Sequence, residues 1–174
     1  DVVGNSDFSN QSDSNLTVYI FGEAVTVPCS LEDFLDSGMI INENELNMIL
    51  ESANQTFTMI PAASSDSKAA LYLKIITGSD PDKGAGNATV VTITNNSSAL
   101  GGYFKIKDGH TIGSNVHDVL ASYGDGYIVD VADYDDDFSK GMVTVHYGEN
   151  ERILLWFMDG ELYYIETFYR DFSS

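Results

Sequence analysis

The sequence SLEDFLDS, residues 30–37, is matched 85 positions later by NVHDVLAS, residues 115–122. Each stretch opens with a residue that caps helices well, Ser30 or Asn115, and has an aspartate three positions later. The cap side chain can accept a hydrogen bond from the third backbone N–H, and the acid can reach back to the cap, as in a capping box. Both stretches therefore predict the start of a short helix.

Apolar residues fall at matching places in the two stretches. Their i, i+3, i+4 spacing puts them on one face of a helix. Gly38 and Gly124 follow near the C-terminal cap, where a positive φ is favoured. We expect equivalent helices at 31–37 and 116–122, with these six side chains buried: Leu31, Phe34, Leu35, Val116, Val119 and Leu120.

Segments rich in Val, Ile, Thr and aromatic residues follow each predicted helix and indicate strands. They are residues 56–60, 70–77 and 88–94, then 127–132, 142–147, 153–158 and 162–169. Asp159-Gly160 is a two-residue hairpin signal. Residues 45–53 fit a helix, but Asn54-Gln55 suits a hairpin turn, and we favour the hairpin.

These patterns predict an α+β fold made of two similar units, each a short helix packed on an antiparallel sheet. The units are expected at residues 17–100 and 101–174. Residues 1–16 are dominated by Asn, Ser and Asp, so we expect a flexible leader there.

Residues 25–38, VTVPCSLEDFLDSG, resemble the opening motif of secreted lipoproteins from Gram-positive bacteria. Residues 109–124, GHTIGSNVHDVLASYG, look like the second signature of that group. The resemblance implies tandem modules of the β-lactamase-inhibitor-like or outer-membrane-lipoprotein-like kind. It also implies an extracellular protein, anchored to the outer face of the cell membrane through an upstream lipid. It assigns no functional residue, because the matching positions are caps, turns and core.

Composition narrows the possible partners. The chain has 174 residues, 43% of them hydrophobic, which excludes a disordered protein. Its formal net charge of −19 disfavours binding to nucleic acids and to anionic lipid. The longest apolar run, residues 153–158, is too short for a membrane helix. The chain begins at Asp1, as expected of a mature or trimmed protein.

Motifs for catalysis or metal binding are weak. Cys29 is the single cysteine, which excludes an intramolecular disulfide and any multi-cysteine metal site. A helix N-terminus can lower a thiol pKa, but we interpret Cys29 as a half-buried filler. The acidic residues 133–137 suggest a calcium loop, yet Phe138 stands where an EF-hand needs glycine. We therefore expect no catalytic residue, no metal site and no cofactor.

The last two predicted strands carry the expected binding surface. A two-residue turn at Asp159-Gly160 would place Trp156 opposite Tyr163 and Phe157 opposite Leu162. The same pairing puts Leu154 opposite Ile165 and Leu155 opposite Tyr164. In the neighbouring strands Val129, Val131, Val143 and Val145 are expected to face the core, and Thr144 to face outward. The expected ligand-binding residues are Trp156, Tyr163, His146 and Asp130.

The sequence thus favours a non-catalytic, exported envelope module that binds a protein or a glycan through its sheet. Two alternatives remain open: a structural or assembly lipoprotein with no discrete ligand, and a small hydrolase. Trp156 and Tyr163 could instead pack against the first unit or against a partner subunit.

Overall fold

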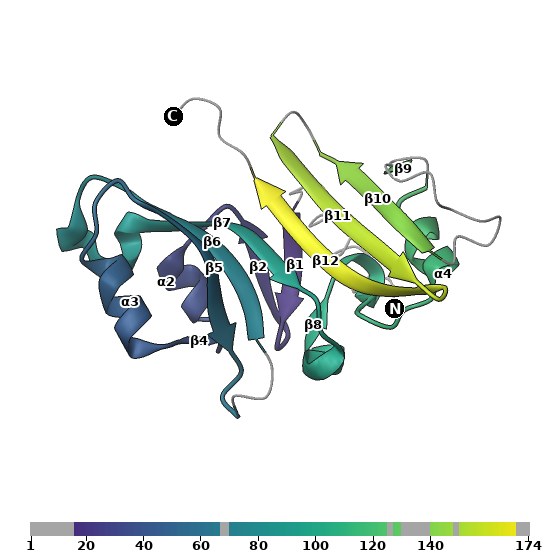
Figure 1. Ribbon diagram of the computed structural model, residues 1–174, viewed down its shortest axis with the longest axis horizontal. Helices are drawn as coiled ribbons and strands as arrows, with labels where there is room; N and C mark the ends of the chain where they lie inside the picture. The colour runs from purple at the N-terminus through teal and green to yellow at the C-terminus, as the bar shows by residue number, and fades with distance from the viewer. Residues whose placement is uncertain (1–15, 67–69, 125–126, 130–139, 148–149, 170–174) are drawn as a thin grey trace.

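The computed structural model describes residues 16–66, 70–124, 127–129, 140–147 and 150–169 (Figure 1). The helices are α2 (Leu31–Leu35), α3 (Glu43–Leu50) and α4 (Val116–Ala121), with 3₁₀ segments η1 (Pro81–Asn87), η2 (Ser98–Tyr103) and η3 (Lys107–Gly109). The strands are β1 (Leu16–Ile20), β2 (Glu23–Val27), β3 (Cys29–Ser30), β4 (Ile40–Ile41), β5 (Thr56–Ala63), β6 (Ala70–Thr77), β7 (Ala88–Asn95), β8 (Phe104–Lys105), β9 (Tyr127–Val129), β10 (Lys140–His146), β11 (Glu151–Met158) and β12 (Glu161–Tyr169). The α+β class is confirmed.

The strands form two antiparallel sheets. The large sheet has the order β4-β5-β6-β7-β12-β11-β10-β9, and the short β3 pairs with β7 beside this path. The small sheet has the order β2-β1-β8. β7 and β12, far apart in sequence, pair through Thr92↔Phe168 to Asn95↔Ile165 at the centre of the large sheet.

One face of the large sheet is covered, and the core lies beneath it. β1 contacts β11 and β12, while β2 contacts β7 and β12, so the small sheet packs across the middle (Figure 1). α2 contacts β7 at one end and α4 contacts β12 at the other. The largest fully buried side chains include Phe34 of α2, Phe104 of β8 and Phe157 of β11.

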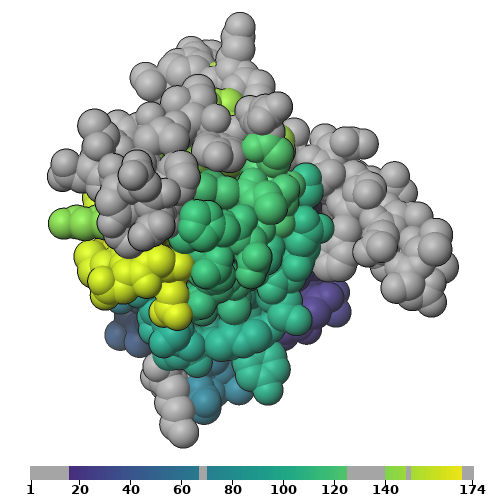
Figure 2. Space-filling model, turned by 90° about the vertical axis from the view of Figure 1, so that its right-hand side faces the viewer, coloured from purple at the N-terminus to yellow at the C-terminus, as the bar shows by residue number. Residues whose placement is uncertain are grey.

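The α4 end is fastened to the β11–β12 hairpin by backbone hydrogen bonds. The N–H of Val116 donates to the carbonyl of Gly160 at 2.9 Å, and the N–H of Leu162 donates to that of Ser114 at 2.9 Å. Figure 2 shows this end of the molecule, where the green surface around α4 adjoins the yellow surface of β12.

The repeated motif forms two helices, and α2 ends two residues and α4 one residue before the predicted end. Ser30 Oγ accepts from the backbone N–H of Asp33 at 3.1 Å, and Asn115 Oδ1 accepts from those of His117 at 2.9 Å and Asp118 at 3.3 Å. Within the described part of the chain neither aspartate side chain returns the bond, because aspartate is one methylene shorter than the glutamate of a full capping box. Each helix thus has the hydrogen bond from the helix backbone to the cap side chain, but not the second bond of the predicted capping box.

Five of the six side chains predicted to be buried are so, and Leu35 is half-buried. Two other predictions are wrong. Leu16, assigned to the leader, is fully buried in β1. The segment before Asn54 is the helix α3 and not a strand of a hairpin, because Asn42 caps it at the backbone N–H of Asn44 (3.0 Å) and Ile49 anchors it in the core.

The predicted register between β11 and β12 is also wrong by one residue along most of its length. Phe157 pairs with Leu162 as expected, but a β-bulge follows, and Trp156 then pairs with Tyr164. Leu155 consequently faces Ile165, and Leu154 faces Glu166. The bulge inserts Tyr163 as an extra residue, so the simple count from the turn fails.

In β10 the predicted alternation holds for the core positions. Val143 and Val145 are buried on the covered face, and Thr144 is on the opposite one, where neighbouring side chains also bury it. Residues 130–139, which include Asp130, Val131 and the proposed calcium loop, lie outside the described residues, as does the side chain of Val129.

Candidate ligand-binding face

The second face of the large sheet is not covered by any described helix or strand, and we refer to it as the uncovered face. Alternation along β11 buries Ile153, Leu155 and Phe157 in the core, whereas Trp156 is 38% exposed and Met158 44% exposed on the opposite side. In Figure 1 no described helix or strand lies over this face. A sheet in a two-layer fold must bury only one face, so the other is available to a ligand.

Cross-strand pairing arranges the side chains of this face in rows. The first row runs Lys74, Thr92, Phe168, Arg152, His146 from β6 to β10. The second runs Tyr72, Thr94, Glu166, Leu154, Thr144 across the same strands. The third is shorter and consists of Tyr164, Trp156 and Met142. Successive rows are two residues apart along each strand, or roughly 7 Å.

Aromatic rings cluster in the third row. Trp156 meets the ring of Tyr163 edge to face, with centroids 6.0 Å apart, and the ring of Tyr164 at 5.9 Å. Beside them Lys140, Met142 and Met158 line a small recess of about 80 Å³. Trp156 thus presents a partly exposed ring that is surrounded by tyrosine, methionine and lysine side chains.

Glu166 is held by two hydroxyl groups. The Tyr164 hydroxyl donates to Glu166 Oε1 at 2.9 Å, and Thr94 Oγ1 lies 3.4 Å from the same oxygen. Burial and the neighbouring carboxylate raise the pKa of Tyr164 to about 12. The tyrosine is therefore a neutral hydrogen-bond donor at physiological pH.

A shallow groove of about 190 Å³ lies over β5, β6, β7 and β12. Met59, Tyr72 and Phe168 give it apolar walls, and Lys74, Thr92 and Glu166 supply polar groups. The guanidinium of Arg152 lies over the ring of Phe168, 4.6 Å from its centroid. This groove and the Trp156 cluster are neighbouring parts of one face.

The structure brings some of the expected site residues together and separates others. Trp156 and Tyr163 touch, as expected, although through the bulge and not as a direct pair. His146 is exposed on the same face, but it lies opposite Arg152 in the first row, four residues along β10 from the partner of Trp156. Asp130 lies outside the described residues.

Sequence reasoning missed several residues of this face. Arg152 and Tyr164 could have been found, because strict alternation from Trp156 along β11 and the neighbouring strand points to them. Lys74, Tyr72 and Thr92 could not, because only the pairing of β7 with β12 brings them to the face.

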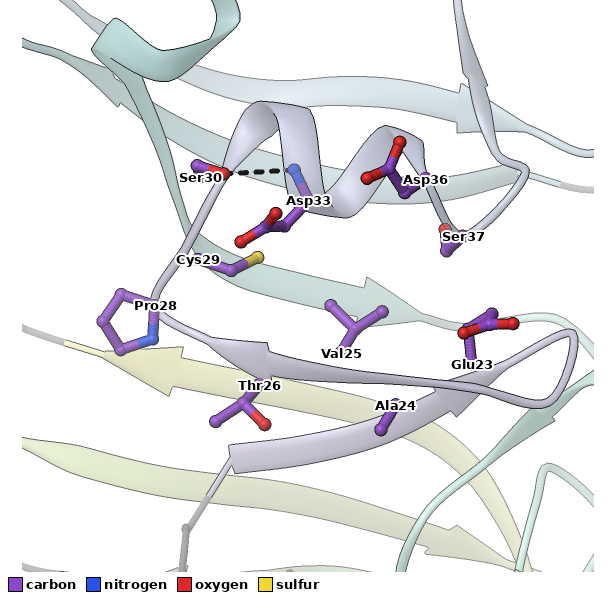
Figure 3. A pocket seen from close by; sticks show the side chains of 10 residues that line it. All are labelled: Glu23, Ala24, Val25, Thr26, Pro28, Cys29, Ser30, Asp33, Asp36 and Ser37. Atoms are coloured by element: carbon purple, nitrogen blue, oxygen red, sulfur yellow. Dashed lines mark hydrogen bonds between the residues drawn. The ribbon is translucent and has the colours of Figure 1, made fainter.

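A different cavity, of about 570 Å³, lies between β2 and α2 (Figure 3). Figure 3 shows Asp33 next to Cys29, with Val25 and Glu23 on the strand below the helix. Burial, and to a smaller extent Asp33, raise the pKa of the half-buried Cys29 thiol to about 12. A protonated thiol among carboxylates is not a nucleophile, so this cavity offers no visible chemistry.

The histidines do not assemble a metal site. His110 Nε2 is 2.9 Å from Ser122 Oγ, whereas His117 and His146 are exposed on separate elements. Across the described residues no group of three His, Cys, Asp or Glu side chains is arranged to hold a metal ion.

Comparisons add no relative. No known protein family, curated protein or solved structure matches this chain. Among the described helices none has the length and apolar character needed to cross a membrane.

Proposed function

We propose that this chain is a non-catalytic binding module that recognises a partner protein on the uncovered face of its large sheet. The observation that carries the proposal is the composition of that face: Trp156, Tyr72, Tyr164, Phe168, Met142 and Arg152 lie within three adjoining rows, with Tyr163 and Met158 beside them. Trp, Tyr, Met and Arg are the residues enriched at the energetic centres of protein interfaces. An uncovered face also favours binding over a purely structural role.

A protein fits this face better than a glycan. Sugar hydroxyls both donate and accept, and amide side chains match them because each amide does the same. The three rows contain no Asn or Gln, and their one carboxylate, Glu166, is already engaged by Tyr164 and Thr94. Apolar and aromatic groups dominate what remains.

We also propose that the module works outside the cell, anchored by an upstream lipid. This rests on the resemblance of residues 25–38 and 109–124 to secreted lipoproteins of Gram-positive bacteria. The strongly acidic composition is compatible with that location, since it keeps the module soluble and away from anionic surfaces.

The tandem architecture is part of the same proposal. Two parallels support it: α2 contacts β7 and α4 contacts β12, the last strand after each helix. Each N-cap residue also pairs with that strand, Ser30 with Thr89 and Asn115 with Glu161. In a tandem of this kind the uncovered face would run continuously across the junction of the two units, at β7 and β12.

A photocrosslinking experiment tests the binding proposal. A benzoylphenylalanine replaces Met158 on the face or, as the matched control, Tyr103, which is 64% exposed on η2. Each variant is displayed on the envelope of the source cells and irradiated. We expect a crosslinked protein from position 158 only, and its loss when Trp156→Ala is added. Equal crosslinking from both positions, or binding of the chain to a glycan array through Trp156, would contradict the proposal.

A further inference from the structure

The first row of the face crosses the pair β7 and β12 at the centre of the large sheet. It carries one cation on each side of this pair, Lys74 on β6 and Arg152 on β11. Lys74 pairs with Thr92, Thr92 with Phe168 and Phe168 with Arg152, on four adjacent strands. With strands about 4.8 Å apart, the backbones of Lys74 and Arg152 are separated by about 14 Å. Lys74 therefore lies within the groove over β5, β6, β7 and β12, and Arg152 lies beyond its β12 edge.

Neither cation is neutralised within the described structure. Arg152 stacks on Phe168, and its buried Nε has no hydrogen-bond partner. The side chain of Lys74, which is half-buried, has no hydrogen bond or ion pair with another described residue. Lysine and arginine number only 8 against 27 acidic residues, so a cation in this chain has many carboxylates to choose from. Two unpaired cations in one row are unexpected unless something else binds them.

A third group in the row is also unsatisfied. Thr92 is only 7% exposed, lines the groove, and its buried Oγ1 has no hydrogen-bond partner. A buried hydroxyl is normally hydrogen-bonded. Rotation about its χ1 bond would exchange the methyl and hydroxyl groups, so an acceptor in the groove could satisfy it.

We propose, resting on the proposed function above, that this groove receives a segment of the partner protein that carries a carboxylate beside an apolar side chain. Arginine stacked on an aromatic ring keeps its guanidinium edge free to bind a carboxylate with two parallel hydrogen bonds. Lys74 adds a second charge from the other side. The apolar side chain packs on Phe168 and Met59, the wall residues of the groove.

Charge complementarity selects this occupant. Lys74 lines the groove, Arg152 stacks on its wall residue Phe168, and Glu166 is the single carboxylate among the lining residues, whereas the whole chain has a net charge of −19. The first row is thus a cationic strip on the surface of an acidic protein. It attracts an acidic segment at short range, and the surrounding acidic surface rejects partners that are acidic throughout.

The experiment uses random dodecapeptides displayed on phage and selected on the whole chain. Selected peptides are synthesised, and their affinity is measured by fluorescence anisotropy against the wild type and two double variants. Lys74→Met with Arg152→Met removes the two charges of the groove. Lys83→Met with Lys105→Met removes two exposed charges elsewhere and is the control matched for net charge.

We expect the selected peptides to contain Asp or Glu next to an aromatic or aliphatic residue. The groove variant should bind at least about tenfold more weakly and the control within about twofold of wild type. Replacing the peptide acid by its amide should cost a similar factor, and added salt should weaken binding. Peptides without acids, or equal affinity for both double variants, would overturn the inference.

A second measurement does not depend on the double variant folding. 3-Phenylpropanoate and its uncharged amide are titrated into the ¹⁵N-labelled wild-type chain. The carboxylate alone should shift the backbone resonances of Lys74, Thr92 and Arg152; absent or equal shifts would overturn the inference. Peptides that require Trp156 but neither cation would leave the proposed function standing while refuting the acidic partner. Self-association of the chain abolished in the groove variant would make a second copy the occupant and also refute it.

Discussion

Cys29 illustrates how two local effects compete at one residue. It directly precedes Ser30, the cap of α2, and helix dipoles lower the pKa of thiols at such positions. The helix has only five residues, however, and the thiol is half-buried next to Asp33, so its pKa rises to about 12. Desolvation and the neighbouring carboxylate prevail over a short dipole.

Because its pKa is raised, the Cys29 thiol should react slowly with disulfide reagents in the folded protein. Only the thiolate reacts with a disulfide reagent such as DTNB, so native Cys29 should react far more slowly than free cysteine at about pH 8. Unfolding in guanidinium chloride should restore the ordinary rate. Asp33→Asn should accelerate the native reaction only modestly, because burial is the larger cause. A native rate equal to that of free cysteine would contradict this account.

At the scale of elements, local sequence patterns predict which helices and strands form better than they predict how the strands pair. Caps, apolar spacing and β-branched runs depend on neighbours within a few residues, so the sequence predicts α2, α4, β5 to β7 and β9 to β12, but not the small sheet of β1, β2 and β8. The sequence does not predict the bulge at Tyr163, because the stability of a bulge depends on the packing of the whole hairpin. The pattern of residues 45–53 leaves α3 undecided against a hairpin strand, and the cap at Asn42, which decides for the helix, lies upstream of that segment.

In the candidate site, too, the sequence predicts contacts between residues near in the chain but not contacts that depend on long-range strand pairing. Trp156 and Tyr163 were expected to touch because they flank a recognisable turn, and the ring contact exists despite the shifted register. The sequence does not predict the groove, since Lys74 and Arg152 are 78 positions apart and come to lie in one row only through the pairing of β7 with β12. Long-range strand order has no local sequence signal.

Strand β11 offers a prediction based on its alternation. Phe157→Ala should destabilise the protein by about 3–5 kcal/mol, because Phe157 is 1% exposed and lies in the core. Trp156→Ala should cost only about 1–2 kcal/mol, because the larger ring is 38% exposed and packs mainly on Tyr163 and Tyr164. Urea unfolding of the two variants measures both. A loss for Trp156→Ala as large as that for Phe157→Ala would make Trp156 a core residue and exclude it from the binding face.

At the scale of the whole molecule, the expected boundary at residues 100 and 101 is crossed by two sheets. β8, just after the boundary, pairs with β1 through Ile20↔Phe104, and β7 pairs with β12. The β1–β2 hairpin also contacts strands on both sides. The hairpin, with the buried side chains Leu16, Val18 and Ile20, thus covers β11 and β12 of the second half as well as β7 of its own half.

The molecule should therefore unfold in a single cooperative transition. Differential scanning calorimetry should give one peak whose calorimetric and van't Hoff enthalpies agree. Ile93→Ala in β7 and Leu155→Ala in β11 remove fully buried side chains from opposite halves, and both should lower the midpoint of that same peak. Residues 101–174 expressed alone should show no cooperative transition, because they lack the β1–β2 hairpin that covers β11 and β12. Two peaks, with each substitution affecting only one, would instead mean that the halves fold independently, and the shared sheet would then join two domains and not complete one core.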